Sequence, residues 1–463
     1  MPGSGKDATG PGGGGLRLLL RRFRGEPREQ LVVFTRCPEP GRTKTRLIPV
    51  VGREGAAELQ RRMTEHTMHT AGTLAGRRPL SLEVRFEGGS ERLIRRWLGP
   101  DSAYAEQGGR DLGEKMRRAF DDAFARSMTR VVVVGCDCPG VTARLLESAF
   151  DALRERDVVL GPASDGGYYL IGLRAPEPRV FQDIPWGTAE ALARTLEAAQ
   201  AAALSVCRLE TLDDVDRPED LPVWQRVAAS WEEPSGAPRV TVIIPTLNEA
   251  ANVGFAVATA ARGRDTEVIV VDGGSDDGTA DIARSCGAAV MTARRGRATQ
   301  MNAGAAAAGG ELLVFLHADT QLPWGFDDCV REALATPSVS AGAFGFRVEG
   351  GGAALRMVER LVSCRARRWQ MPYGDQALFV RAETFRAVGG YPEMPIMEDY
   401  ELVRRLRRLG RVVVVHSAAL TSARRWARLG PVNAALTNQL AVLAYRSGMS
   451  PERILRWYRR ARG

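Results

Sequence analysis

Three apolar segments in the C-terminal half of the chain each end in polar and acidic residues. The acids that follow them are Glu249, Asp272 and Asp319, the last within the stretch ELLVFLHADT. A short apolar run without helical period is typical of a buried parallel strand, and ligands bind at the carboxyl ends of such strands in an open α/β sheet. If the three strands are neighbours, their acids converge on one crevice. Carboxylates gathered there suit a divalent cation and a sugar nucleotide.

The N-terminal half repeats this arrangement after its own predicted strands. The predicted strand 31–34 runs into a loop where a glycine precedes Lys44 and Arg46. Backbone amides and fixed positive charges in such a loop suit a phosphate group, although a solvated basic loop accounts for the spacing almost equally well. Asp137 follows another predicted strand and holds the place that Asp319 holds in the other half. Further aspartates after predicted strands are Asp165, Asp213, Asp214 and Asp216.

The length and composition of the chain limit the number of domains and the kinds of ligand that we expect. A chain of 463 residues exceeds what one hydrophobic core usually serves, so two domains are expected. Its 44% hydrophobic and 26% charged residues are typical of a soluble globular protein. The net charge of +9 favours anionic partners, and no basic stretch is interleaved with aromatics, so we expect phosphate ligands and no nucleic acid. Seven scattered cysteines indicate reduced thiols in a cytoplasmic protein, and no apolar run reaches the length of a bilayer span.

Composition and strand positions divide the chain into five predicted segments. The first, 1–29, is rich in glycine and is expected to be disordered. A linker is expected at 229–238, where proline, glycine and serine gather. It separates a predicted α/β domain at 30–228 from a second one at 239–420. The last segment, 421–463, carries helical patterns that are rich in arginine.

Several motifs of the N-terminal half resemble those of the DUF2064 family. They read FTRCPEPGRTKTRL, QGGRDLGEKM, GCDCPG, GPASDGGYYLIG and DDVDRPEDL, and they cover about residues 31–224. This family has a GT-A fold and is related to nucleotidyltransferases and glycosyltransferases. The first loop has fewer glycines than the loops of sugar or molybdopterin nucleotidyltransferases. The resemblance implies that Lys44 and Arg46 meet phosphate and that Asp137 holds a metal ion.

The C-terminal half resembles the family 2 glycosyltransferases, which are inverting enzymes. The motifs are VTVIIPTLNEAANV, VIVVDGGSDDGTADIA, RRGRATQMNAG, LLVFLHADT and MEDYELVRRLRRLG, and they cover about residues 240–410. The two resemblances together imply an α/β protein with two tandem GT-A-like domains. Each would be a Rossmann-like domain of the nucleotide-diphospho-sugar transferase kind, with a mainly parallel sheet.

The second resemblance also assigns residues to the donor site. It implies that Asp272 contacts the nucleotide base and that Asp319, in the place of the family's Asp-x-Asp, binds Mg²⁺ or Mn²⁺. The remaining nucleotide contacts that it implies are Pro245, Thr246, Glu249 and one arginine of RRGRATQMNAG, for which Arg297 is our candidate beside Arg294 and Arg295.

The histidines leave several readings open. His317 stands where the family has its first aspartate, and it could hydrogen-bond ribose, ligate the metal or be a structural residue; the sequence supports these readings equally. His66 and His69 lie three residues apart on a predicted helix. No third metal ligand is suggested there, so we expect them to be surface or core histidines.

The acceptor side needs a base, because the attacking hydroxyl must lose its proton. The resemblance places the family's Glu-Asp pair at Glu398 and Asp399, with Asp399 as the general base. An acidic pair at a helix start is also ordinary capping chemistry. The segments 374–376 and 389–391 precede this pair and are expected to shape the acceptor side.

The sequence therefore predicts a hexosyltransferase-like glycosyltransferase that moves a sugar from a nucleoside-diphosphate donor. We expect a metal-dependent, inverting reaction on an unknown acceptor, either a small molecule or a lipid. The N-terminal half is a second glycosyltransferase, a nucleotidyltransferase that makes the activated donor, or a silent module that binds nucleotide or a partner. The basic C-terminal helices are expected to pack over the acceptor cleft, with peripheral membrane contact as the alternative.

Overall fold

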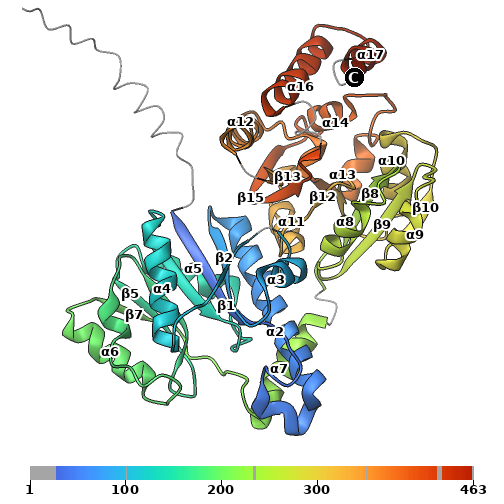
Figure 1. Ribbon diagram of the computed structural model, residues 1–463. Coiled ribbons are helices and arrows are strands. Elements are labelled where there is room, and N and C mark those ends of the chain that lie inside the picture. Colours follow the sequence, from blue (N-terminus) through green and yellow to red (C-terminus); the bar gives the residue numbers. More distant parts are fainter. Residues whose placement is uncertain (1–27, 101, 233–235, 351, 425–429, 461–463) are drawn as a thin grey trace, which may run out of the picture.

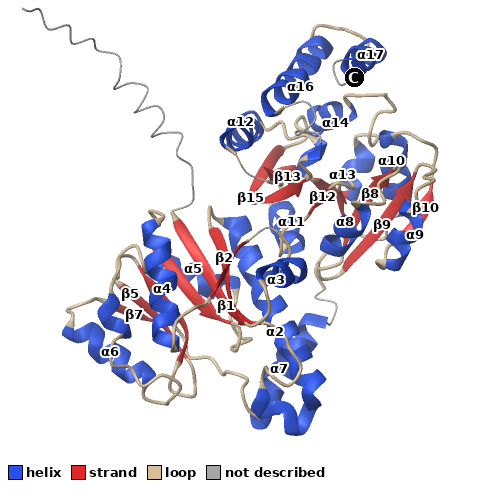
Figure 2. Cartoon of the chain, viewed as in Figure 1, coloured by secondary structure: helices blue, strands red, loops and turns tan. Residues whose placement is uncertain are grey.

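The computed structural model describes residues 28–100, 102–232, 236–350, 352–424 and 430–460. Two mainly parallel sheets lie between layers of helices, one in each half of the chain (Figures 1 and 2). The predicted α/β class with two tandem, mainly parallel sheets is confirmed. Most of the segment expected to be disordered, 1–29, lies outside the described residues. So do residues 233–235 of the expected linker.

The first sheet has the strand order β3-β2-β1-β4-β6-β5-β7. Every pairing is parallel except those of β6, which runs antiparallel to β4 and to β5. The sequence analysis did not predict β6 as a strand. The bounds are β1 (Glu29–Arg36), β2 (Ser81–Glu87), β3 (Ala103–Glu106), β4 (Arg130–Gly135), β5 (Val158–Pro162), β6 (Tyr168–Leu173) and β7 (Val206–Arg208).

Helices cover both faces of this sheet because its central strands are apolar on both sides. Leu31 and Val33 of β1 pack toward α2 and α5, whereas Val32 and Phe34 pack toward α4. Successive side chains of a strand point to opposite faces, so β1 contributes to a hydrophobic core on each face of the sheet. The bounds are α2 (Ile48–Arg77), α3 (Glu91–Leu98), α4 (Leu112–Ala125), α5 (Ala143–Ala152), α6 (Ala191–Ala201) and α7 (Leu221–Glu232). Helix α7 therefore continues into the expected linker.

The second sheet has the strand order β10-β9-β8-β11-β14-β13-β15-β12. The strands β8, β9 and β11 are parallel neighbours, as predicted, and β14 joins them antiparallel. The bounds are β8 (Val240–Thr246), β9 (Thr266–Asp272), β10 (Ala289–Thr292), β11 (Leu312–Phe315), β12 (Thr320–Gln321), β13 (Val339–Val348), β14 (Leu378–Arg381) and β15 (Arg411–Thr421).

Strand β8 shows how this sheet is covered. Val242 and Ile244 pack with α8 and α11, and Ile243 packs with α10 on the other face. Helices α12, α16 and α17 form a further layer near the C-terminus (Figure 1). The bounds are α8 (Val253–Ala260), α9 (Thr279–Ser285), α10 (Arg297–Ala307), α11 (Phe326–Ala335), α12 (Ala353–Trp369), α13 (Ala382–Ala387), α14 (Glu398–Leu406), α16 (Pro431–Arg446) and α17 (Pro451–Arg460).

The two halves pack against each other through α2, which contacts α11 and β15. A Cβ atom at Gly72 would lie 2.0 Å from the backbone oxygen of Trp324, and one at Gly76 would lie 2.1 Å from Sγ of Cys329. Glycine at both positions therefore allows the close approach. The Trp324 indole is buried in the core of the first half, and its Nε1 donates to the backbone oxygen of Leu98 at 2.6 Å.

Candidate functional site

The carboxyl ends of β8, β9 and β11 lie side by side, so Glu249, Asp272 and Asp319 share one edge of the second sheet. Glu249 lies in the loop after β8, and both of its carboxylate oxygens accept hydrogen bonds from Arg424 at 2.9 Å. Its backbone N–H donates to Thr279 Oγ1. Glu249 is thus held by partners of its own, and a ligand would have to compete with Arg424 for its carboxylate.

Asp272 is buried at the end of β9 and organises the turn that follows. Its two oxygens accept from the backbone N–H groups of Gly274 and Ser275, from the Ser275 hydroxyl and from the Thr246 hydroxyl. Burial alone would raise the pKa of Asp272, but these hydrogen bonds outweigh it and hold the pKa below its ordinary value. The carboxylate therefore stays ionised. Thr246, and Pro245 before it, end the neighbouring strand β8.

His317 and Asp319 lie in the short loop between β11 and β12. His317 is buried, whereas Asp319 is partly exposed. The side chain of Asp319 accepts from the Thr320 hydroxyl at 3.4 Å, and its backbone oxygen accepts from the N–H of Ser422, just after β15. The loop is thus anchored to β15, while the Asp319 carboxylate keeps capacity for a ligand.

Three elements meet at Gly374. A Cβ atom at this position would lie 2.3 Å from Oδ2 of Asp399 and 2.8 Å from Nε2 of His317. Asp399 belongs to the first turn of α14, His317 to the β11–β12 loop, and Gly374 to a single turn of 3₁₀ helix before β14. The structure therefore brings the predicted base next to the predicted donor loop, with glycine leaving the space between them.

Arg297, at the start of α10, connects the acids of this site. Its guanidinium lies 3.2 Å from the buried carboxylate of Glu398. Partial desolvation opposes its ionisation, although the side chain is 46% exposed, and the charges of Glu398, Asp399 and Asp319 raise the pKa of Arg297 above its ordinary value. One arginine thus lies within electrostatic reach of all three carboxylates, and among the candidates 294, 295 and 297 it is Arg297 that the structure brings to them.

Asp399 has the environment of a proton acceptor. Burial and the charge of Glu398 raise the pKa of Asp399 to about 7, against the opposing charge of Arg297. Its Oδ1 is buried and has no hydrogen-bond partner among the described residues. A general base works best when its pKa lies near the working pH. An unpaired buried oxygen also costs free energy unless a ligand satisfies it.

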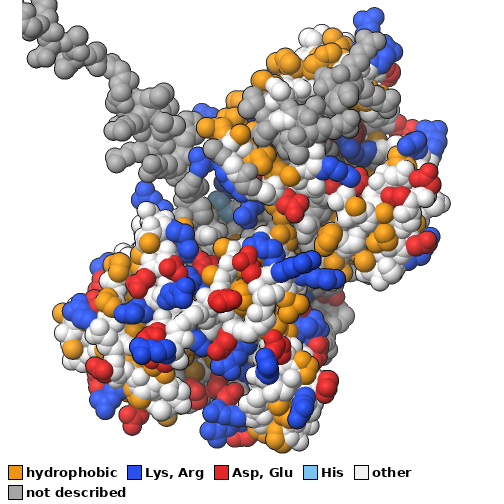
Figure 3. Space-filling view, in the orientation of Figure 1, with side chains coloured by type: hydrophobic (Ala, Val, Ile, Leu, Met, Phe, Trp, Pro, Cys, Tyr) orange, Lys and Arg blue, Asp and Glu red, His pale blue; other side chains and the backbone are white. Residues whose placement is uncertain are grey.

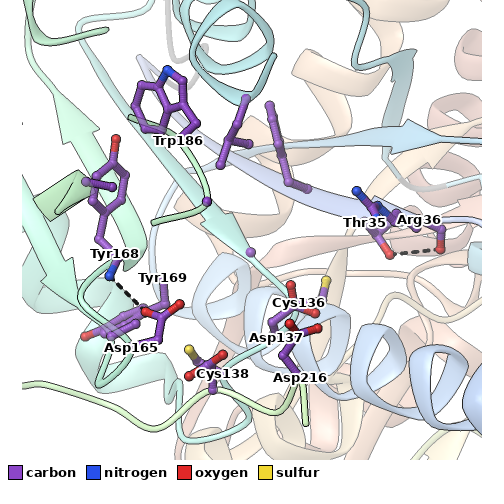
Figure 4. Close-up of a pocket in the computed structure, with 18 of the residues that line it drawn as sticks. Thr35, Arg36, Cys136, Asp137, Cys138, Asp165, Tyr168, Tyr169, Trp186 and Asp216 are labelled. Carbon is purple, nitrogen blue, oxygen red and sulfur yellow. Dashed lines mark hydrogen bonds between the residues drawn. The ribbon is translucent and has the colours of Figure 1, made fainter. Parts of the chain in front are cut away.

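A pocket of about 610 Å³ lies at the edge of the first sheet (Figure 4). Asp137, Asp216 and Asp165 gather at one end of it, and Tyr168 and Trp186 lie at the other (Figure 4). The pocket thus combines a group of carboxylates with an aromatic wall.

The predicted residues of the first half lie in this pocket and pair with one another. Lys44 is buried, and its Nζ lies 2.6 Å from Oδ1 of Asp137. Arg46 forms an ion pair with Asp216. Burial and the charge of Asp165 raise the pKa of Asp214 to about 6. Five acids and four cations line the pocket, and among the described residues no three of these carboxylates lie close enough together to share a metal ion.

The sequence matches two family descriptions, one in each half. Residues 70–188 match "Uncharacterized protein conserved in bacteria (DUF2064)", and residues 241–384 match "Glycosyl transferase family 2". The chain joins a DUF2064 domain to a family 2 glycosyl transferase domain. Asp137 lies within the first match, whereas Lys44 and Arg46 precede it. Asp319 lies within the second match, and Glu398 and Asp399 follow it.

Solved structures of sugar-nucleotide enzymes are similar to parts of this chain. A putative nucleotide-diphospho-sugar transferase from Desulfovibrio desulfuricans G20 is 37% identical, with 43% of this chain and 87% of that one covered and a TM-score of 0.41. The mannosyltransferase PcManGT from Pyrobaculum calidifontis, in complex with GDP-Man and Mn²⁺, is 23% identical over 50% and 73% of the two chains, with a TM-score of 0.36. TarS from S. aureus in complex with UDP is 16% identical over 42% and 64%, with a TM-score of 0.33. Among curated proteins, no match was found.

The glycosyl transferase domain has one partly exposed carboxylate, Asp319, that fits a divalent cation. Around it the described residues show no group of three acids or histidines close enough to share an ion; the one such group is His69, Asp327 and Asp328, between the two domains. Mg²⁺ is commonly bound through one or two carboxylates together with substrate phosphates. The residues present fit an ion that Asp319 holds, with His317 nearby and donor oxygens completing its shell.

Some functional residues were missed by the sequence analysis. Lys115, which pairs with Glu87 at 2.9 Å, and Trp186 line the pocket of the DUF2064 domain. Lys115 lies in the motif QGGRDLGEKM, from which no site residue was assigned, and Trp186 lies outside the motifs of the first half. His66 is half-buried and His69 is buried, and His69 belongs to the interface between the domains, where Asp327 accepts its hydrogen bond. None of the helices in the described segments is both long and apolar enough to cross a membrane.

Proposed function

We propose that the glycosyl transferase domain moves a sugar from a nucleoside-diphosphate donor to an acceptor hydroxyl with inversion. The observation that carries the proposal is the meeting of His317, Gly374 and Asp399 beside Asp319 and Arg297. It puts Asp399, a base with a pKa of about 7, next to the loop that carries Asp319, the proposed metal ligand. Hexosyl transfer, metal dependence and the inverting course are parts of this proposal.

The chain's own residues would divide the work as follows. Pro245, Thr246 and the Asp272 turn form the nucleoside side of the cleft, with Glu249 beyond them. Asp319, with His317 beside it, would hold Mg²⁺ or Mn²⁺. The bound ion supplies neutralisation of the charge that develops on the leaving diphosphate.

Asp399 acts on the opposite side of the sugar. The acceptor oxygen attacks the anomeric carbon, the bond from that carbon to the diphosphate oxygen breaks, and its electron pair leaves with the diphosphate. Asp399 accepts the proton of the acceptor hydroxyl, which increases the nucleophilicity of the oxygen. Arg297 lies near all three acids, and its charge keeps Glu398 paired.

A thermal-shift screen of sugar nucleotides with and without Mn²⁺ tests this proposal. A donor that binds the folded chain raises its unfolding temperature through ligand linkage. We expect one nucleotide class to do so in the presence of Mn²⁺, and the effect to be smaller in Asp319→Ala. If no sugar nucleotide stabilises the wild-type chain, the proposal is wrong.

For the DUF2064 domain we propose binding of a phosphate-bearing nucleotide, with Asp137 at a metal ion and with Lys44 and Arg46 at phosphate. The pocket of about 610 Å³, with its carboxylates and aromatic wall, supports this ligand class. Transfer by this domain, as a second glycosyltransferase or a nucleotidyltransferase, and a silent binding role are the remaining alternatives. All seven cysteines are free thiols, which supports a cytoplasmic setting for both activities.

A further inference from the structure

A cavity of about 1150 Å³ lies between α12, α14 and α16. It adjoins the proposed acceptor side. Tyr373 and Tyr400 line it, and these residues directly precede Gly374 and directly follow Asp399. The cavity therefore lies next to the elements that carry Gly374 and Asp399.

Arginines dominate the charged lining of this cavity. Arg365 is buried, its guanidinium lies 3.7 Å from the centre of the Tyr373 ring, and its Nη2 donates to Oε1 of Gln376 at 3.4 Å. The Nε of Arg365 is buried without a hydrogen-bond partner among the described residues. A buried, unpaired donor of this kind costs free energy unless a ligand accepts its hydrogen bond.

Three further arginines that line the cavity lack an acidic partner among the described residues. Arg368, Arg407 and Arg446 are exposed, and none of them has an ion pair with a described residue. The carboxylate of Glu401 is already paired with Arg404 at 2.9 Å. The cavity therefore carries an excess of positive charge that an anionic group would neutralise.

The mouth of the cavity is apolar. Trp369 is 63% exposed and Leu443 is 59% exposed, and both line the cavity. Leu436 and Leu440 continue this exposed row along α16, at helical spacing from Leu443. Hydrophobic side chains gather over α12 and α16 in Figure 3. An exposed apolar row beside uncompensated arginines matches the boundary between lipid chains and anionic headgroups.

We propose that this cavity binds the phosphate of a lipid acceptor, with the lipid chain against the apolar row of α16 and an acceptor hydroxyl directed toward Asp399. The inference rests on the proposed glycosyl transfer and names its acceptor class. The occupant is an amphiphile that carries phosphate, since a free phosphate compound would leave the row Leu436, Leu440 and Leu443 uncovered.

Co-sedimentation of the full chain with vesicles tests this inference. We compare mixed vesicles of phosphatidylglycerol and phosphatidylcholine with vesicles of phosphatidylcholine alone. The variant Arg368→Gln/Arg446→Gln should bind the anionic vesicles roughly 30-fold more weakly than the wild type, because each arginine near an anionic surface contributes about 1 kcal/mol. The matched control is Arg92→Gln/Arg96→Gln, which removes two exposed arginines of α3 and should bind like the wild type.

Two further measurements identify the source of the phosphate. Leu443→Ser should weaken vesicle binding but leave the Mn²⁺-dependent binding of sugar nucleotide unchanged. Free glycerol 3-phosphate should raise the unfolding temperature less than anionic vesicles do at equal phosphate concentration. Equal or greater stabilisation by glycerol 3-phosphate, or dimerisation of the chain through the apolar row, would overturn the lipid assignment.

Equal vesicle binding by the wild type and by Arg368→Gln/Arg446→Gln would also overturn it. The result for vesicle binding can be distinguished from the result for sugar-nucleotide binding, which tests the proposed function. If the wild type binds anionic vesicles through these arginines but binds no sugar nucleotide, glycosyl transfer fails while the lipid site stands. If the wild type binds a donor but the arginine substitutions leave vesicle binding unchanged, the lipid site fails while glycosyl transfer stands.

Discussion

Nε2 of His69 lies 3.1 Å from Oδ1 of Asp327, and this pair joins the DUF2064 domain to the glycosyl transferase domain. Both side chains are buried. Burial opposes protonation of His69, but the hydrogen bond to Asp327 and the charges of Asp327 and Asp328 raise its pKa above the ordinary value. The same contact and Arg331 hold the pKa of Asp327 below its ordinary value, although burial opposes this. The contact therefore favours the ionic form of the pair.

Asp327→Ala should destabilise the whole chain by about 3–5 kcal/mol, because removing one member of a buried ion pair leaves the other uncompensated. It would also deprive Arg331 and the backbone N–H of Arg264 of their acceptor. Urea unfolding measures the change. Asp328→Ala, in which a partly exposed acid of the same helix is removed, should cost clearly less. Equal losses would show that the buried pair has no special role.

Gly72→Ala should separate or distort the interface, because the new methyl carbon would meet the backbone of Trp324 at 2.0 Å. We expect a destabilisation of about 1–3 kcal/mol, as for other overpacked sites. Gly254→Ala in α8 is the matched control. Its Cβ would find ordinary contacts at 3.5 Å and 3.6 Å, so helix propensity should make it neutral or slightly stabilising. A Gly72→Ala variant as stable as this control would contradict the close packing.

Asp319→Ala should abolish the part of donor binding that depends on Mn²⁺, because its carboxylate is the protein ligand proposed for the ion. Titration calorimetry with the best sugar nucleotide, with and without Mn²⁺, measures the effect. Asp281→Asn, an exposed acid on α9, should bind donor like the wild type. Unchanged affinity and metal response in Asp319→Ala would remove the residue from this role.

Asp399→Asn should bind donor normally but lose transfer by about 10²–10⁴-fold, the usual contribution of a general base. In the wild type, transfer should rise with pH through about 7, as Asp399 loses its proton, and then level off. A flat profile between pH 6 and pH 8, or normal turnover of Asp399→Asn, would exclude it as the base.

The same residue makes a prediction about stability. Its pKa is about 7 in the folded chain and about 4 in an unfolded one, so the folded state binds more protons between these values. Asp399 therefore contributes to the free energy of unfolding below about pH 4, and this contribution is lost as the pH rises through about 7. In Asp399→Asn this group no longer titrates. The free energy of unfolding of the variant relative to the wild type, measured with urea, should therefore be larger at pH 8 than at pH 5.

Asp137→Asn, made in the Asp319→Ala chain, isolates the pocket of the DUF2064 domain. Any Mn²⁺-dependent nucleotide binding that Asp319→Ala retains should disappear in this double variant. The retained binding should also weaken as pH falls below about 6, because Asp214 then becomes protonated. Retained binding in the double variant would mean that Asp137 does not hold the ion.

The strand tips were predictable because apolar runs that end in acids mark the carboxyl edge of a parallel sheet. Val240–Thr246 and Thr266–Asp272 lie where the sequence indicated, as parallel neighbours. The strand Tyr168–Leu173 was not predicted, since its antiparallel pairing depends on partners far along the chain. The cavity beside α14 was not predictable either. Its arginines come from three helices, and no local spacing shows that they converge.

Helix α2 has one end in each functional region. Gln60 lines the pocket of the DUF2064 domain, and about three turns later His69 and Gly72 contact the other domain. The oxygen of Gly72 accepts from Ser417 on β15, the strand that also holds the loop of Asp319. Local unfolding of either domain would therefore disturb helix α2, which both domains share. A nucleotide that occupies only one pocket should delay heat denaturation of both domains together, in a single calorimetric transition.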